Sequence, residues 1–96
     1  MFARLVLVKC EAGKEATFVQ RARAALSFYL SQPGCQGVHL LQSRADRRQL
    51  VALSLWDREV DLIVAREQPA YQQVMAGLDE TYAEPQSVGE WDVVAL

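Results

Sequence analysis

The chain has 96 residues, with twelve acidic and ten basic side chains, one histidine and a formal net charge of −2. This length suits one domain, which we expect to span residues 1–96. The basic residues are scattered along the chain, so we expect no nucleic-acid partner. No segment is long and apolar enough to cross a bilayer, and the charges of Arg4 and Lys9 interrupt the apolar start of the chain. We therefore expect a cytoplasmic protein that does not associate with membranes.

The first predicted element is a strand over residues 2–10, which is rich in valine and leucine. Its apolar side chains fall at both odd and even positions, a pattern typical of a central strand covered on both faces. Gly13 ends the strand. Apolar residues then recur at steps of three and four and predict a helix over residues 14–30. The segment Gln32-Pro33-Gly34 stops this helix, because proline cannot continue it and glycine permits the turn.

Two strands of similar length are predicted next, over residues 36–43 and 49–56. A short polar segment joins them, which predicts a hairpin. Asp57 follows the second of these strands and is the predicted N-cap of another helix. An apolar helical pattern continues from there but is interrupted at Pro69, so we expect two helical segments, one on each side of this proline.

A closing strand over residues 87–96 completes the order strand–helix–strand–strand–helix–strand. This order predicts an α+β, ferredoxin-like βαββαβ fold with an antiparallel sheet. Residues 49–56 carry apolar side chains on both parities, so the sheet face without helices would also be apolar. An identical sheet is the simplest cover for such a face, and we expect a homodimer with two-fold symmetry.

The two cysteines, Cys10 and Cys35, belong to no CxxC motif and have no histidine-rich neighbourhood. We expect them at the same end of the sheet, with one strand between them. Two strand spacings amount to about 9.6 Å, whereas a disulfide requires Cα atoms within roughly 7 Å. The sequence therefore predicts two free thiols.

Three short segments resemble the antibiotic biosynthesis monooxygenase (ABM) domain family. They are Pro33-Gly34-Cys35-Gln36-Gly37, Leu53-Ser54-Leu55-Trp56-Asp57 and Pro69-Ala70-Tyr71. The resemblance covers essentially the whole chain and implies a dimeric α/β barrel. The family includes cofactor-free oxygenases of polycyclic aromatic substrates, quinol oxygenases and haem-degrading enzymes.

Three residues are candidates for catalysis. The resemblance implies that Trp56 borders a substrate pocket, where its indole would give an apolar wall and one N–H donor; the alternative is that it plugs the end of the core. Tyr71 could hold or protonate a substrate oxygen, or be a core residue whose hydroxyl reaches the surface. His39 is the only side chain that ordinarily titrates near neutral pH and is a candidate general base, with a structural or interfacial role as the alternative.

We expect no cofactor and no metal site. In haem-degrading relatives the proximal histidine would align near Met75, and this chain has no histidine after His39. The resemblance implies a cofactor-independent monooxygenase acting on a small aromatic or quinol-type substrate in an apolar pocket between helices and sheet. Active relatives often carry an amide before the tryptophan, where this chain has Ala52 and Ser54. The alternative is a non-catalytic dimer of the same fold that binds a small apolar molecule or serves as an accessory protein.

Overall fold

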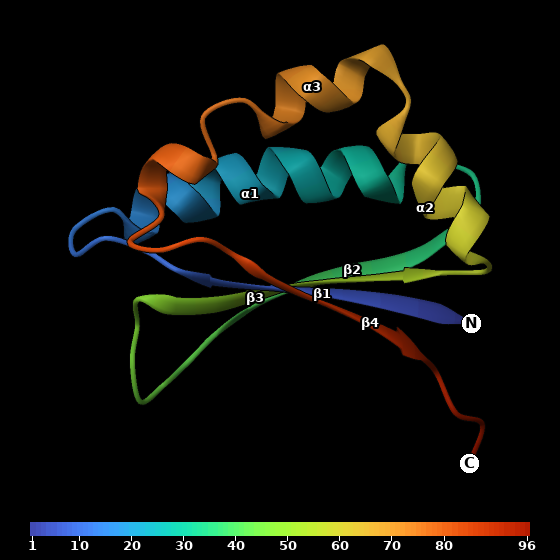
Figure 1. The fold of residues 1–96 in the computed structure, drawn as a ribbon, viewed down its shortest axis with the longest axis horizontal. Helices are drawn as coiled ribbons and strands as arrows, with labels where there is room; N and C mark the ends of the chain where they lie inside the picture. Colours follow the sequence, from blue (N-terminus) through green and yellow to red (C-terminus); the bar gives the residue numbers. More distant parts are fainter.

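The computed structural model describes all 96 residues as a four-stranded sheet with its helices on one face (Figure 1). The elements are β1 (Phe2–Lys9), α1 (Glu15–Leu30), β2 (Cys35–Gln42), β3 (Gln49–Trp56), α2 (Glu59–Arg66), α3 (Pro69–Met75), a short 3-10 turn (Asp79–Thr81) and β4 (Ser87–Asp92). This order confirms the predicted ferredoxin-like α+β fold. The closing strand is shorter than predicted. No helix has the length and apolar character that a membrane span requires.

The strands lie in the order β2-β3-β1-β4, and every neighbouring pair is antiparallel. In the β1–β3 ladder Phe2 faces Trp56 and Lys9 faces Gln49. Because successive side chains of a strand point to opposite faces, this register sends the even-numbered residues of β1 and β3 toward the helices. The odd-numbered residues of both strands point to the open face.

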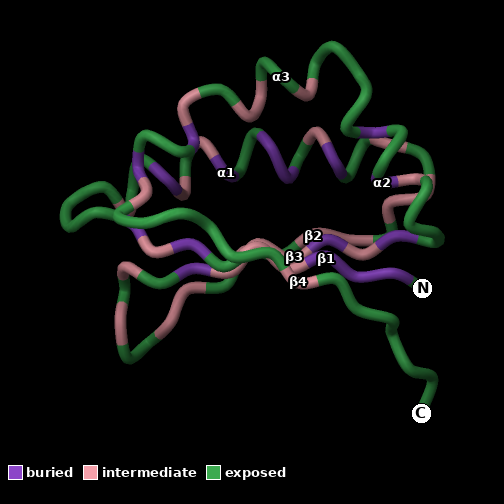
Figure 2. Tube along the Cα trace, viewed as in Figure 1, coloured by how far each residue is buried: buried purple, intermediate pink, exposed green.

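The helix-covered face holds two clusters of buried apolar side chains. One contains Val8, Cys10, Phe18, Ala22, Ala25, Leu50 and Leu78, and the other contains Phe2, Leu26, Tyr29, Trp56, Leu62 and Ala65. Both clusters join α1 to the sheet, and Figure 2 shows the buried positions of α1 recurring along the side that meets the strands. The amphipathic spacing of α1 therefore fixes this helix over the sheet.

The open face is also apolar. It carries Ala3, Leu5, Leu7, Leu41, Val51, Leu53, Leu55 and Trp91. Leu7, Leu41 and Trp91 are 40%, 53% and 61% exposed, values high for such large apolar side chains. The Trp91 indole folds back over Gly89, where an added Cβ would lie 2.6 Å from its Nε1. The predicted apolar character on both faces is confirmed, whereas the cover by a second copy stays a prediction.

The break between α2 and α3 falls before Pro69, as predicted, and this proline occupies the first turn of α3. The predicted N-cap is wrong by one residue. Arg58 precedes α2, and its backbone N–H donates to the Asp61 carboxylate at 3.2 Å. The Asp57 carboxylate instead accepts a hydrogen bond of 2.8 Å from the Gln36 side chain, because Gln36 lies next to it across the end of the β2–β3 hairpin.

Both cysteines are free thiols, as predicted, but they lie at opposite ends of the sheet. Cys10 follows the Lys9 end of β1, whereas Cys35 pairs with Trp56 at the other end. The predicted placement at one end is therefore wrong. Two successive antiparallel pairings make β1 and β2 parallel to each other, so the end of β1 and the start of β2 are separated by the length of the sheet.

Candidate functional site

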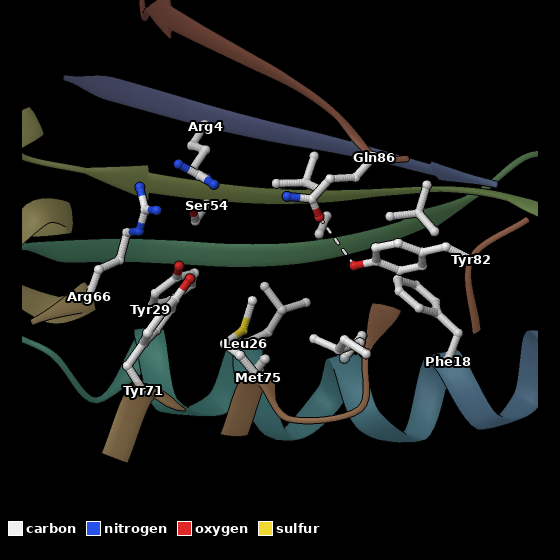
Figure 3. Close-up of a pocket in the computed structure, with 16 residues that line it drawn as sticks. Arg4, Phe18, Leu26, Tyr29, Ser54, Arg66, Tyr71, Met75, Tyr82 and Gln86 are labelled. Atoms are coloured by element: carbon white, nitrogen blue, oxygen red, sulfur yellow. Dashed lines mark hydrogen bonds between the residues drawn. The ribbon is translucent and has the colours of Figure 1, made fainter. Parts of the chain in front are cut away.

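A cavity of about 110 Å³ lies between the sheet, α1 and the segment that contains α3 (Figure 3). Twelve of its sixteen lining residues are hydrophobic. Small side chains help to leave this space open, namely Ala22 and Ala25 on α1 and Ala52 on β3, all of which line the cavity. The larger apolar walls are Val6, Val8, Phe18, Leu26, Met75 and Leu78. The sheet and helices thus border an apolar chamber that is close in size to a single small ring.

One end of the cavity is polar and cationic. Figure 3 shows two guanidinium groups and two phenol hydroxyls directed toward this end, with the Ser54 hydroxyl near them. The contributing residues are Arg4 on β1, Ser54 on β3, Tyr29 on α1, Arg66 on α2 and Tyr71 on α3. Arg4 and Ser54 are direct neighbours in the β1–β3 ladder. Five elements therefore converge on one cluster of hydrogen-bond donors, which we call the cationic end.

The two phenols of the cationic end lie together. The rings of Tyr29 and Tyr71 are stacked with their centroids 6.3 Å apart and an interplanar angle of 23°. The Arg66 guanidinium lies 5.9 Å from the centroid of the Tyr71 ring, within cation–π range. Burial, followed by the nearby Tyr71 phenol, raises the pKa of Tyr29 to about 12. Tyr29 is therefore a neutral hydrogen-bond donor at physiological pH.

The opposite end of the cavity has a smaller polar pair. The Tyr82 hydroxyl donates to Oε1 of Gln86 at 3.2 Å. Burial, and then the negative charge of Asp79, raises the pKa of Tyr82. The Tyr82 ring packs against Phe18 at a centroid distance of 6.2 Å. The cavity thus has an apolar middle with hydroxyl groups at both ends.

The structure brings two of the three predicted catalytic residues to this region. Tyr71 lines the cavity. Trp56 is fully buried and lies behind the lining, with its ring edge-on to Tyr29 at a centroid distance of 5.3 Å and an angle of 81°. Its Nε1–H has no hydrogen-bond acceptor. His39 pairs with Leu53 on the open face, so the sheet separates it from the cavity of its own chain. The catalytic roles themselves stay predictions.

Sequence reasoning missed both arginines of the cationic end and Gln86 at the other end. The signal for Arg4 was present, because it occupies the same parity as the apolar residues Phe2, Val6 and Val8 of a central strand. A charge at such a position is exceptional and points to a site. Arg66 gave no signal of its own, since it lies in a polar segment before Pro69. No group of three or more His, Cys, Asp or Glu side chains is arranged to hold a metal ion.

The fold and the cavity define a class of small ferredoxin-like proteins with an apolar cavity between helices and sheet. A model of the family described as antibiotic biosynthesis monooxygenase matches residues 1–77. The chain therefore belongs to this family, as the resemblance of its sequence motifs indicated. No curated protein sequence matches the chain.

Solved structures extend the fold comparison to nearly the whole chain. A protein from Nitrosomonas europaea, provisionally named an antibiotic biosynthesis monooxygenase, has a TM-score of 0.90 at 19% identity, covering 99% of this chain and 100% of that one. A mutant of SnoaB, a cofactor-independent oxygenase from Streptomyces nogalater, has a TM-score of 0.89 at 19% identity, over 99% and 94% of the two chains. Rv0793 from Mycobacterium tuberculosis has a TM-score of 0.86 at 17% identity, over 99% and 96%. At these identities the likeness establishes the shared fold.

Proposed function

We propose that residues 1–96 act as one domain that is a cofactor-independent monooxygenase for small aromatic or quinol-type substrates. The observation that carries this proposal is the apolar cavity with phenol donors at both ends. A quinol ring has the matching shape, with apolar faces and an oxygen at each end. The family match and the likeness to a cofactor-independent oxygenase of the same fold support the proposal.

The size of the cavity favours a single ring over a polycyclic substrate. A cavity of about 150 Å³ binds benzene in another protein. The cavity of this chain, at about 110 Å³, is somewhat smaller and requires a small outward movement of its walls to admit a substituted ring. The Met75 side chain belongs to α3, which has no buried residue, so this helix is the wall that moves most easily.

The proposed reaction needs no external reductant. A 1,4-hydroquinone and dioxygen give a hydroxyquinone and water: one oxygen atom forms a C–O bond and the other leaves as water. The ring supplies all four electrons. The hydroxyl must first lose its proton, and positive charge close by lowers its pKa and favours this step. Arg4 and Arg66 supply that charge, and no residue of the lining is an ordinary base near neutral pH, so solvent takes the proton.

The protein then positions the substrate anion for electron transfer to dioxygen. The Tyr71 and Tyr29 phenols donate hydrogen bonds to the substrate oxygen, and the apolar walls exclude water from the reacting carbon. Trp56 acts through Tyr29, whose ring it supports edge-on, and is a positioning residue. The proposal assigns no step to His39, which lies across the sheet. His39→Gln is accordingly expected to leave oxygen uptake unchanged.

The test is oxygen uptake with a panel of single-ring hydroquinones, without added metal or flavin. Isotopic dioxygen should deliver one labelled atom to the quinone product. The double variant Trp56→Phe, Tyr71→Phe should slow uptake by about tenfold or more, because it removes one donor and one support of the site. The matched control is Trp91→Phe, which alters the tryptophan of the open face. No uptake across the panel, or uptake unchanged in the double variant, would refute the oxygenase.

The lining favours one alternative, a non-catalytic ligand-binding dimer, because it includes no side chain that titrates near neutral pH. Turnover of any hydroquinone would exclude that alternative. For either function we propose a homodimer in which the open faces of two copies pack together. The exposed apolar side chains of this face support the pairing. The two unpaired thiols favour a reducing compartment, and we place the protein in the cytoplasm.

A further inference from the structure

We infer that the substrate carries a carboxylate, which binds Arg4 and Arg66 at the cationic end of the cavity. The inference rests on the proposed function in one respect: it treats the cavity as the substrate site. It goes further by naming the chemical class that the cavity selects, an aromatic ring with a carboxylate on it. Neutral quinols would be the poorer ligands.

Arg4 is a buried charge without a counter-charge. The residue is 8% exposed and lies on the central strand. It takes part in none of the four ion pairs of the chain. Glu90 lies opposite it in the β1–β4 ladder, but this residue is exposed and forms no ion pair with it. A buried guanidinium is costly unless an anion compensates it. No acidic side chain of the chain compensates this charge, so a ligand is the natural partner.

The lining of the cavity carries positive charge only. The sixteen lining residues include two arginines and neither aspartate nor glutamate. The chain as a whole has a net charge of −2, so the positive sign belongs to the cavity and not to the protein in general. Low-dielectric walls concentrate the field of such charges and favour an entering anion. The cavity therefore discriminates by sign of charge.

The cationic end offers more hydrogen-bond donors than a single oxygen atom can use. Two guanidinium groups meet two phenol hydroxyls and the hydroxyl of Ser54, which is 3% exposed. A phenolate offers only one oxygen to such a cluster. A carboxylate offers two oxygens with about four acceptor positions, and its planar geometry matches a guanidinium fork. The cluster suits a carboxylate better than it suits a single quinol oxygen.

The remainder of the cavity accommodates the rest of this ligand. With the carboxylate between Arg4 and Arg66, the ring lies against Leu26 and Met75. The hydroxyl ortho to the carboxylate then stays at the cationic end, where the proposed reaction removes its proton. The second ring hydroxyl extends toward the Tyr82–Gln86 pair at the opposite end, where Figure 3 shows the two polar groups in contact. The ligand is thus amphipathic along its length, as the cavity is.

The test is equilibrium binding by calorimetry in the absence of oxygen, with 2,5-dihydroxybenzoate and its neutral near-isostere 2,5-dihydroxybenzamide. The wild-type chain should bind the acid about tenfold or more tightly than the amide. Arg4→Gln should weaken binding of the acid by about thirtyfold and binding of the amide by less than about threefold, because only the acid loses a charged partner. Arg4→Lys should retain part of the preference for the acid.

Arg44→Gln is the matched control, since it removes the same charge from an exposed position in the β2–β3 turn and should leave both affinities unchanged. Circular dichroism establishes that each variant is folded. If Arg4→Gln does not fold, Arg66→Gln gives the same comparison from an exposed residue of the same cluster. Equal affinity of the wild-type chain for acid and amide, or an acid preference that survives substitution of both arginines, would overturn the inference.

The binding test is independent of turnover. Oxygen uptake with neutral hydroquinones and no preference for the acid would leave the proposed oxygenase standing and overturn the carboxylate inference. A preference for the acid that depends on Arg4, without any uptake, would support the carboxylate site and refute the oxygenase.

Discussion

The two faces of the sheet depart from the usual rules of burial in opposite directions. The helix-covered face encloses an arginine among apolar side chains, whereas the open face presents leucine and tryptophan side chains to solvent. Both departures reduce the stability of an isolated subunit. Each would be relieved by something that the single chain does not contain: the proposed carboxylate ligand on one face and the second sheet of the proposed dimer on the other.

In a chain this small, the two departures from the rules of burial mark the places where function lies. The interior of a 96-residue domain contributes only modest stability, so a buried charge is a substantial loss. A loss of stability caused by the buried charge of Arg4, next to a cavity, indicates a binding role for this residue. The apolar surplus on the open face indicates an assembly role instead. The following experiments test this division of roles between the faces.

The largest expected effect contrasts the two tryptophans. Trp56→Ala should lower the free energy of unfolding by about 3–5 kcal/mol, because it empties a fully buried site. Trp91→Ala should change it by less than about 0.5 kcal/mol in the isolated subunit, because that indole is 61% exposed. Urea unfolding at two protein concentrations measures the change in the free energy of unfolding for both variants. Comparable losses in dilute solution would contradict the contrast between the faces.

The next effect concerns assembly. Leu53→Asp places a charge in the middle of the open face and should raise the dissociation constant of the proposed dimer by about a hundredfold. Sedimentation equilibrium gives this constant. Ile63→Asp is the control, since it makes the same kind of change at an exposed residue of α2 on the helical side. A wild-type chain that stays a well-behaved single subunit at micromolar concentration would contradict the dimer.

A smaller effect of opposite sign is expected at the cationic end. Arg4→Met should raise the free energy of unfolding of the ligand-free chain by about 1–2 kcal/mol, because it removes an uncompensated buried charge. Arg66→Met, at an exposed position, should change it far less. Thermal and urea unfolding measure the change in the free energy of unfolding for each variant. Destabilisation by Arg4→Met would mean that the charge serves the fold and not a ligand.

The smallest effect is a pH dependence caused by Tyr29. Its pKa is raised from an ordinary value near 10 to about 12, so the folded chain favours the neutral phenol. Its contribution to stability is complete below pH 10 and is lost as the pH rises toward 12. Tyr29→Phe should therefore reduce the stability difference between pH 9 and pH 11 by about 1 kcal/mol. An unchanged difference would show that this phenol ionises as it does in the unfolded chain.

The fold could be predicted from the sequence because its signals are local. Short apolar runs in the strands, the helical spacing of apolar residues, the polar hairpin turn and Pro69 each determine a structure within a few residues of themselves. The relation between Cys10 and Cys35 is not local. It depends on two successive strand pairings, and the sequence prediction placed the two cysteines at the same end of the sheet, whereas they lie at opposite ends.

The site was predictable only in part. The family resemblance indicated Tyr71, and it led to Trp56, which lies one layer behind the cavity wall. The face on which His39 lies depends on hairpin register, since a shift of one residue would turn its side chain to the other face. Arg4 was treated as an interruption of an apolar run, although its parity placed it among the buried residues. The joint arrangement of Arg4 and Arg66 arises only when α2 is folded over the sheet.

The short helix α3 has a consequence for the entry and release of a ligand at the cavity. None of its residues is buried, and Gly77, just beyond its end, has a positive φ of 80°. Segments of this kind detach at low free energy while the rest of a domain stays intact. Amide hydrogens of α3 should therefore exchange with heavy water sooner than those of α1. A ligand that contacts both Tyr71 and the sheet would slow that exchange, because it would hold α3 against the rest of the domain.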